Sequence, residues 1–132
     1  MSNLEPLEPT EALELYLQGR DDATERTLEG QDYRLRAFVQ WCDEEGIVNL
    51  NELTGRDLYK YRVWRREGGY SGTELKMVTL RGDLATLRAF LRFCAQIDGV
   101  RSDLYEQVPL PPVNGSEDVS DSTLDPDRAL AI

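Results

Sequence analysis

Two segments that lie far apart in the sequence follow one pattern, and the pattern is helical. Residues 27–42 read TLEGQDYRLRAFVQWC, and residues 79–94 read TLRGDLATLRAFLRFC. Eight of the 16 aligned positions are identical, among them a glycine at the fourth position of each segment. In both segments leucine, phenylalanine and cysteine recur at positions that share one face of an α-helix. The repeat therefore predicts two long helices of one design, each burying its apolar face.

The other periodic stretches also predict helices, and no alternation long enough for a strand interrupts them. The first three predicted helices cover about residues 10–19, 24–45 and 54–67. The fourth ends near Gln96, and a turn at residues 102–108 is a candidate fifth helix. We therefore expect an all-α bundle of four to five helices.

Short polar residues and glycines mark the predicted helix ends. Thr24 is a predicted N-cap, and Gly46 is the expected stop of the helix that follows it. Thr54 opens a capping box in which Asp replaces the usual Glu or Gln. Ser71–Glu74 is a second predicted capping box, with the usual Glu at its last position. The fourth helix therefore begins either there or, after a longer loop, near Met77.

Composition divides the chain into four parts. Residues 1–9 hold two prolines and no periodicity, and we expect them to be a leader. Residues 10–108 hold the predicted helices. Residues 109–122 are rich in Pro, Ser, Asn, Gly and acidic residues, which is typical of a linker. Residues 123–132 resemble a helix start and are expected to be the truncated beginning of a further domain.

Charge is distributed unevenly along the chain. The net charge is −10, but residues 53–92 carry 9 basic and 4 acidic side chains, a net of +5. A basic island can steer a polyanion, although an ordinary solvated helix surface explains the same charges. The chain has 13 Arg and only 2 Lys. An acidic protein with few lysines resembles those of salt-in halophiles, and the competing interpretation is an acidic mesophilic protein.

The two cysteines do not predict a metal site. Cys42 and Cys94 lie 52 residues apart, and the chain has no histidine. A disulfide stays possible, but two buried free thiols are the commoner outcome for cysteines in helical apolar patterns. We expect no cofactor and no metal. No apolar run is long enough to span a membrane and the acidic N-terminus is not a signal peptide, so the expected compartment is the cytoplasm.

The repeated glycines are not explained by core packing. Gly30 and Gly82 fall inside helices, where each costs about 1 kcal/mol relative to alanine. On a helical wheel both point away from the core, with Thr27 and Arg34 beside Gly30, and with Thr79 and Thr86 beside Gly82. Such a face lets a helix backbone come close to another molecule. Threonine and arginine suit DNA phosphates and base edges, while a helix of another protein is the competing partner.

The order of these motifs resembles the core-binding, SAM-like domain of tyrosine recombinases and phage integrases. The helix that opens that domain is similar to Thr27-Leu28, Tyr33, Leu35-Arg36, Phe38 and Trp41. Its other long helix is similar to Thr79-Leu80, Leu84, Thr86-Leu87-Arg88 and Phe90. Between them, Leu53–Leu58 resembles the domain's "lt..di" helix start. The resemblance covers about residues 10–108 and implies an orthogonal bundle.

The resemblance also implies a function. In this family the domain forms half of a C-shaped clamp on double-stranded DNA, and two of its helices cross near the major groove. Carried over to this chain, the expected DNA-binding residues are Thr27, Gly30, Gln31, Arg34, Thr79, Arg81, Gly82 and Thr86. Four recombinase protomers assemble on two DNA sites, so other protomers are expected partners, and a membrane or a small-molecule substrate is not.

The resemblance places catalysis elsewhere. The family's tyrosine nucleophile and its helper residues belong to a downstream domain that we expect to be absent from this chain. We therefore predict a DNA-binding arm that is not an enzyme and has no catalytic residue. The alternative is a helical adaptor that binds another protein through the same glycine faces. A third hypothesis, an enzyme using Glu44 and Glu45, is weak because both lie at a helix end and nothing completes a site.

Overall fold

The computed structural model describes residues 4–112, and within that range every regular element is helical. The α-helices are α1 (Pro9–Gln18), α2 (Glu25–Glu45), α3 (Gly55–Arg66) and α4 (Met77–Gln96). Two short 3-10 helices, η1 (Leu50–Glu52) and η2 (Leu104–Gln107), follow α2 and α4. The predicted all-α fold is confirmed, and the candidate fifth helix is the single 3-10 turn η2.

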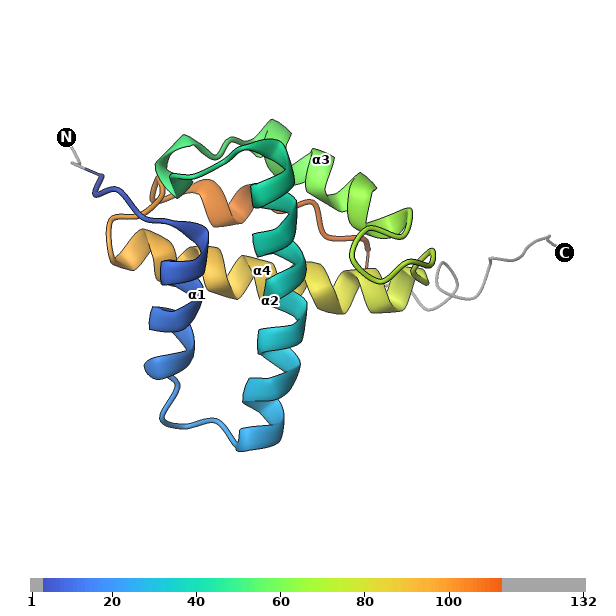
Figure 1. Cartoon of the computed structure of the whole chain (residues 1–132), viewed down its shortest axis with the longest axis horizontal. Helices are drawn as coiled ribbons and strands as arrows, with labels where there is room; N and C mark the ends of the chain where they lie inside the picture. The colour runs from blue at the N-terminus through green and yellow to red at the C-terminus, as the bar shows by residue number, and fades with distance from the viewer. Residues whose placement is uncertain (1–3, 113–132) are drawn as a thin grey trace, which may run out of the picture.

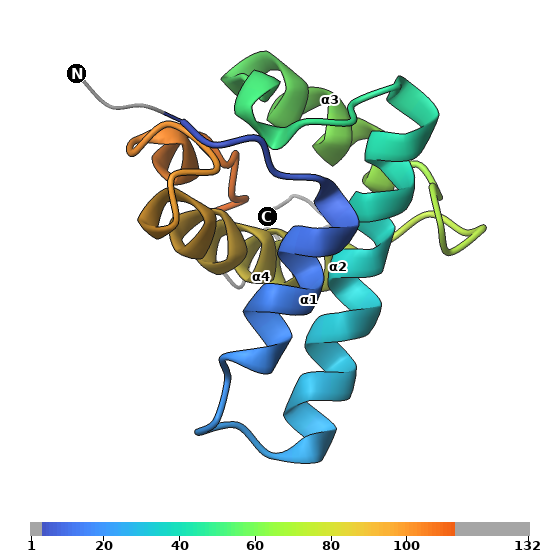
Figure 2. The same ribbon diagram turned by 60° about the vertical axis from the view of Figure 1, so that its left-hand side comes forward.

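The two helices of the repeat cross at the centre of the molecule. In Figure 1 α2 runs upright and α4 passes across it, while α1 lies antiparallel beside α2. Figure 2 shows α3 near the C-terminal end of α2, at the opposite end from the loop that joins α1 to α2. The repeated apolar faces meet in one core, where the Phe38 and Phe90 ring centroids lie 6.3 Å apart. Leu50 and Leu53 of the segment after α2 are also fully buried there.

Local chemistry sets most helix ends where the sequence predicts them. The Thr24 side chain accepts a hydrogen bond from the Thr27 N–H at the start of α2. Gly46 ends α2 in the left-handed region, with φ 76°. Thr54 and Asp57 form both hydrogen bonds of a capping box at the start of α3.

The start of α4 resolves an alternative that the sequence leaves open. The helix begins at Met77, and Ser71 does not cap it. The Ser71 hydroxyl instead donates to the Thr73 carbonyl oxygen at 2.9 Å, and the Leu75 N–H donates to the Arg66 carbonyl oxygen at 3.0 Å. The segment between α3 and α4 is therefore tied back to the end of α3, which keeps it from starting a helix.

The described part of the predicted leader, from Leu4 to Pro9, is part of the fold. Leu7 is buried in the core, its N–H donates to Asn49 Oδ1 at 3.1 Å, and its carbonyl oxygen accepts from the Leu50 N–H at 2.8 Å. Pro9, placed in the leader by the sequence, is the first residue of α1. The sequence did not predict this docking, because one buried leucine between two prolines has no periodicity.

The first residues of the predicted linker are also docked. Arg62 Nη1 donates to the Pro109 carbonyl oxygen at 2.9 Å, and Arg81 Nε donates to that of Pro111 at 3.0 Å. Pro111 is buried against these helices. The rest of the predicted linker and the predicted start of a further domain, residues 113–132, lie outside the described residues.

Both cysteines are free and buried, as expected. Burial raises the pKa of Cys94 to about 12 and also raises the pKa of Cys42 above its ordinary value. In the described part of the chain no helix is long and apolar enough to span a bilayer.

Candidate nucleic-acid interface

A hollow of about 590 Å³ lies where α2 and α4 approach each other on the outer side of the core. Residues of α2, α3 and α4 line it. They are Arg26, Glu29, Gly30, Tyr33, Arg34, Arg65, Val78, Thr79, Gly82 and Asp83. Four of the eight predicted DNA-binding residues are among them, namely Gly30, Arg34, Thr79 and Gly82. The structure therefore brings together the equivalent outward positions of the two repeated segments.

The two glycines leave the helix backbones open in this hollow. A methyl group added at Gly30 or at Gly82 would meet no atom within 4 Å. Neither residue is therefore a glycine for the sake of packing inside this chain. The prediction that both point away from the core is confirmed, and the backbone around them is accessible to a partner.

Arg34 is held across the hollow from α2 to α4. Its Nη1 donates to Thr86 Oγ1 at 3.2 Å, and the Thr86 hydroxyl in turn donates to the Gly82 carbonyl oxygen at 3.1 Å. Thr86 is only 8% exposed. The prediction that Thr86 faces outward is therefore wrong, because the closeness of the crossing buries it. Its role in the structure is to position the Arg34 guanidinium.

Beneath the hollow lies a buried polar cluster that the sequence did not predict. The side chains of Arg65 and Asp83 are each 3% exposed, and Arg65 Nε lies 3.3 Å from Asp83 Oδ2. The Tyr61 hydroxyl donates to the same carboxylate at 3.0 Å. Burial raises the pKa of Asp83, and the Arg65 guanidinium and the Tyr61 hydroxyl oppose that shift. Burial also raises the pKa of Tyr61 well above its ordinary value, so its hydroxyl remains a donor.

The signal for this cluster was present but indirect. Asp83 lies three residues after Leu80 and four before Leu87, which places it on the buried face of α4. An acid on such a face requires a buried partner, and Arg65 lies one turn after buried Tyr61. Arg65 is therefore a structural residue and not a free surface charge.

Aromatic and apolar groups line the hollow beside the charges. The ring centroids of Tyr33 and Tyr70 lie 5.3 Å apart, and the Arg65 guanidinium carbon lies 5.7 Å from the Tyr70 ring centroid. Tyr33 is 52% exposed and Val78 is 57% exposed. Sequence reasoning did not select Tyr33, Val78 or the exposed Arg26, which all line the hollow.

The remaining predicted site residues lie outside the lining. Thr27 is exposed, and its hydroxyl accepts from that of Thr24 at 3.0 Å. Gln31 is half-buried and accepts a hydrogen bond from Arg20 at 2.8 Å. Arg81 is half-buried against Pro111.

Arg81, Arg88 and Arg92 form a stripe of arginines along α4 that contacts the segment after this helix. The guanidinium carbons of Arg88 and Arg92 lie 5.1 and 5.9 Å from the Tyr105 ring centroid, and both side chains stay exposed. Arg81, the first member of the stripe, is bonded to Pro111. The stripe is therefore a second basic surface, separate from the hollow.

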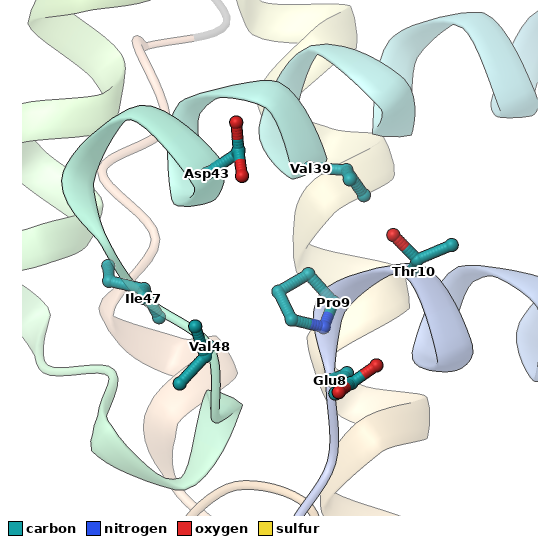
Figure 3. A pocket seen from close by; sticks show the side chains of 7 residues that line it. All are labelled: Glu8, Pro9, Thr10, Val39, Asp43, Ile47 and Val48. Atoms are coloured by element: carbon teal, nitrogen blue, oxygen red, sulfur yellow. The ribbon is translucent and has the colours of Figure 1, made fainter.

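A different hollow, shown in Figure 3, lies between the start of α1 and the end of α2. Its lining combines apolar side chains with two carboxylates and includes no arginine or lysine. The lining residues are Glu8, Pro9, Thr10, Val39, Asp43, Ile47 and Val48. Such a surface repels phosphate, so it does not suit a nucleic acid.

Two long crossing helices with this order of shorter elements define an all-α domain of the SAM-like class. The sequence matches the family model described as the phage integrase N-terminal SAM-like domain over residues 11–96. The chain belongs to this family. The resemblance drawn from the sequence is thereby confirmed.

A solved structure supports the same assignment. The N-terminal domain of a phage integrase/site-specific recombinase from Haloarcula marismortui, a halophilic archaeon, is similar with a TM-score of 0.75 and 38% sequence identity. The match covers 81% of this chain and 99% of that chain. No match was found among curated protein sequences.

Proposed function

We propose that this domain is the DNA-binding arm of a site-specific recombinase and holds duplex DNA in the hollow between α2 and α4. The observation that carries the proposal is the meeting of Gly30 and Gly82, from the two repeated segments, in one hollow that Arg26 and Arg34 also line. Open backbone beside arginine and threonine side chains suits close approach to a phosphate backbone and to base edges.

The charges in the hollow support a limited electrostatic contact. Arg26 and Arg34 are exposed, whereas Arg65 is paired with Asp83 and contributes little net charge. Glu29 lies in the same hollow and repels phosphate. Binding is therefore expected to depend on a few well-placed contacts rather than on a broad basic field.

The domain performs no strand cleavage in this proposal. It positions a DNA site for the catalytic part of a recombinase, which acts with other protomers in a tetrameric synapse in the cytoplasm. The Haloarcula marismortui neighbour, an N-terminal domain of an integrase/recombinase, supports this division of labour by analogy.

The test is binding of a duplex DNA library to the chain across a salt series, read by fluorescence anisotropy. We expect measurable affinity at low salt that falls as salt rises. Arg34→Glu is expected to remove binding. The matched control is Arg36→Glu, which makes the same charge change on the same helix at an exposed side chain outside the hollow.

Three results would contradict the proposal. They are undetectable binding at low salt, affinity that does not fall as salt rises, and equal loss of binding in the Arg34 and Arg36 variants. Circular dichroism of both variants must show an intact fold. Absence of binding would favour the alternative, a helical adaptor that packs another protein against Gly30 and Gly82.

A further inference from the structure

Aromatic and apolar side chains gather beside the arginines of the hollow between α2 and α4. Tyr33 of α2 and Val78 of α4 line this hollow and are 52% and 57% exposed. Tyr70, in the segment between α3 and α4, packs on Tyr33 with the ring centroids 5.3 Å apart. We call Tyr33, Tyr70 and Val78 the apolar rim. Exposed apolar side chains that gather at one place, unlike those scattered singly, mark a contact surface for another molecule.

Tyr70 is held in an unusual backbone conformation. Its φ is 73°, in the left-handed region that a bulky side chain rarely adopts. Arg65 Nη1 donates to the Gly69 carbonyl oxygen at 3.2 Å, and the Gly69 N–H donates to the Trp64 carbonyl oxygen at 2.9 Å. The Arg65 guanidinium carbon also lies 5.7 Å from the Tyr70 ring centroid. A strained residue that its surroundings hold in place is typical of a functional site.

The apolar rim adjoins the open backbone at both glycines. Tyr33 lies three residues after Gly30 on α2, so the two positions are neighbours on one face of the helix. Val78 lies four residues before Gly82 on α4 and is its neighbour in the same way. A ligand that approaches either glycine therefore meets the rim. Because Tyr70 supports the Tyr33 ring before any ligand binds, little side-chain freedom is lost on binding.

The chemistry of the rim suits one of the four DNA bases. Thymine presents an apolar group in the major groove, its C5 methyl, whereas the other bases present only hydrogen-bonding groups there. Arg26 and Arg34 of the same hollow are exposed cations that attract the phosphates of a duplex. From these observations we infer that the apolar rim recognises the C5 methyl group of a thymine in DNA bound in the hollow. The inference rests on the proposed function, because it names the base that the same site selects.

The experiment starts from the duplex that the wild-type chain selects from a DNA library at low salt. Each thymine of that duplex is replaced in turn by deoxyuridine, which lacks only the methyl group and still pairs with adenine. We expect at least one replacement to weaken binding about fourfold, which corresponds to about 0.8 kcal/mol for one buried methyl group. We call this loss of affinity the thymine effect.

Two variants and their matched controls test the residues of the rim. Tyr33→Ala and Val78→Thr should remove the thymine effect, and both should keep salt-dependent binding through the arginines. The controls make the same substitutions on α3, outside the hollow, at Tyr59 and Val63, which are 59% and 37% exposed. Tyr59→Ala and Val63→Thr should keep the full thymine effect. Circular dichroism of all four variants verifies that the fold is intact.

Tyr70→Gly tests whether the strained residue acts through Tyr33. Glycine adopts a φ of 73° without strain, so the segment between α3 and α4 should keep its course. The Tyr33 ring loses its support, and the thymine effect should fall below about twofold because the ring must then be ordered on binding. A Tyr70→Gly chain that keeps the full thymine effect would overturn the role assigned to Tyr70.

Absence of the thymine effect and absence of DNA binding have different meanings. Salt-dependent binding that no deoxyuridine weakens, or selection of a duplex without thymine, would overturn recognition of the methyl group and leave the proposed function in place. A full thymine effect in Tyr33→Ala or in Val78→Thr would overturn it as well, since the methyl group would then be contacted elsewhere. Undetectable DNA binding at low salt would overturn the proposed function and, with it, the role of the rim.

Discussion

Replacing Gly30 and Gly82 by alanine separates the stability of the fold from its function. In an ordinary helix a glycine is a defect, because it loses more backbone entropy on folding than alanine does. Both glycines lie within helices, and neither has a neighbouring atom within 4 Å of an added methyl group. The structure therefore gives no reason within the chain for either glycine.

The magnitude follows from these facts. Each substitution is expected to raise the free energy of unfolding by about 0.5–1 kcal/mol. The double variant should gain about 1–2 kcal/mol, because the two methyl groups contact no common neighbour. That gain corresponds to a rise of roughly 5–10 °C in Tm. DNA affinity should fall by about 1–3 kcal/mol, or roughly five- to 150-fold, if a methyl group blocks a packed contact.

Urea denaturation, thermal unfolding and anisotropy titrations with DNA measure both effects on the same samples. Gly46→Ala is the matched control, since Gly46 has φ 76° and an alanine there is expected to cost about 1 kcal/mol or more. Two outcomes would refute the reasoning. Loss of stability in the Gly30 or Gly82 variant would mean that the space is not free, and higher stability with unchanged DNA affinity would mean that no ligand approaches these glycines.

Three further predictions follow from the buried polar and thiol groups. Asp83→Ala should lower the free energy of unfolding by about 3–5 kcal/mol, because it leaves the buried Arg65 guanidinium without its partner. Asp32→Ala, which removes the more exposed pair with Arg36, should cost less than about 1 kcal/mol in the same urea titration. Similar losses in the two variants would show that the buried pair contributes no more to stability than the exposed one. Thr86→Val should weaken DNA binding, whereas Thr86→Ser should retain it, because only serine keeps the hydroxyl that holds Arg34. In an Arg34→Ala background Thr86→Val should not change DNA affinity any further. The same loss of affinity in both backgrounds would show that Thr86 does not act through Arg34. Because burial raises its pKa to about 12, the Cys94 thiol should stay unreactive toward a disulfide reagent at pH 8 until urea unfolds the chain, and rapid labelling of the native protein would contradict its burial.

The sequence predicted those parts of the fold that depend on neighbours in the chain. Caps at Thr24 and Thr54 and the stop at Gly46 are local hydrogen-bonding and φ requirements, and each lies where it was expected. Ser71 had the same local signal but does not begin a helix. The Leu75 N–H donates to a carbonyl oxygen at the end of α3 instead of to a helix beginning at Ser71, and this contact depends on the tertiary structure.

The candidate site was half predictable for the same reason. A helical wheel places Gly30 and Gly82 on the outer face, because this placement depends only on where the apolar face of the same helix lies. It placed Thr86 outside as well, and missed that the crossing of α2 and α4 buries this residue. The wheel also missed the pairing of Arg65 with Asp83, since only the packing of α3 on α4 brings the two side chains together.

The small number of available cations makes the salt dependence a quantitative test of where DNA lies. Each phosphate neutralised on duplex DNA contributes about −0.9 to the slope of log affinity against log salt. Arg26 and Arg34 are the exposed arginines that line the hollow, so the expected slope is about −2. With this slope, affinity falls only about tenfold between 50 and 200 mM salt, which is compatible with function at elevated salt. A slope steeper than about −4 would require contacts beyond the hollow. Arg88 and Arg92 would then be the first residues to replace, because they remain exposed on the other flank of α4.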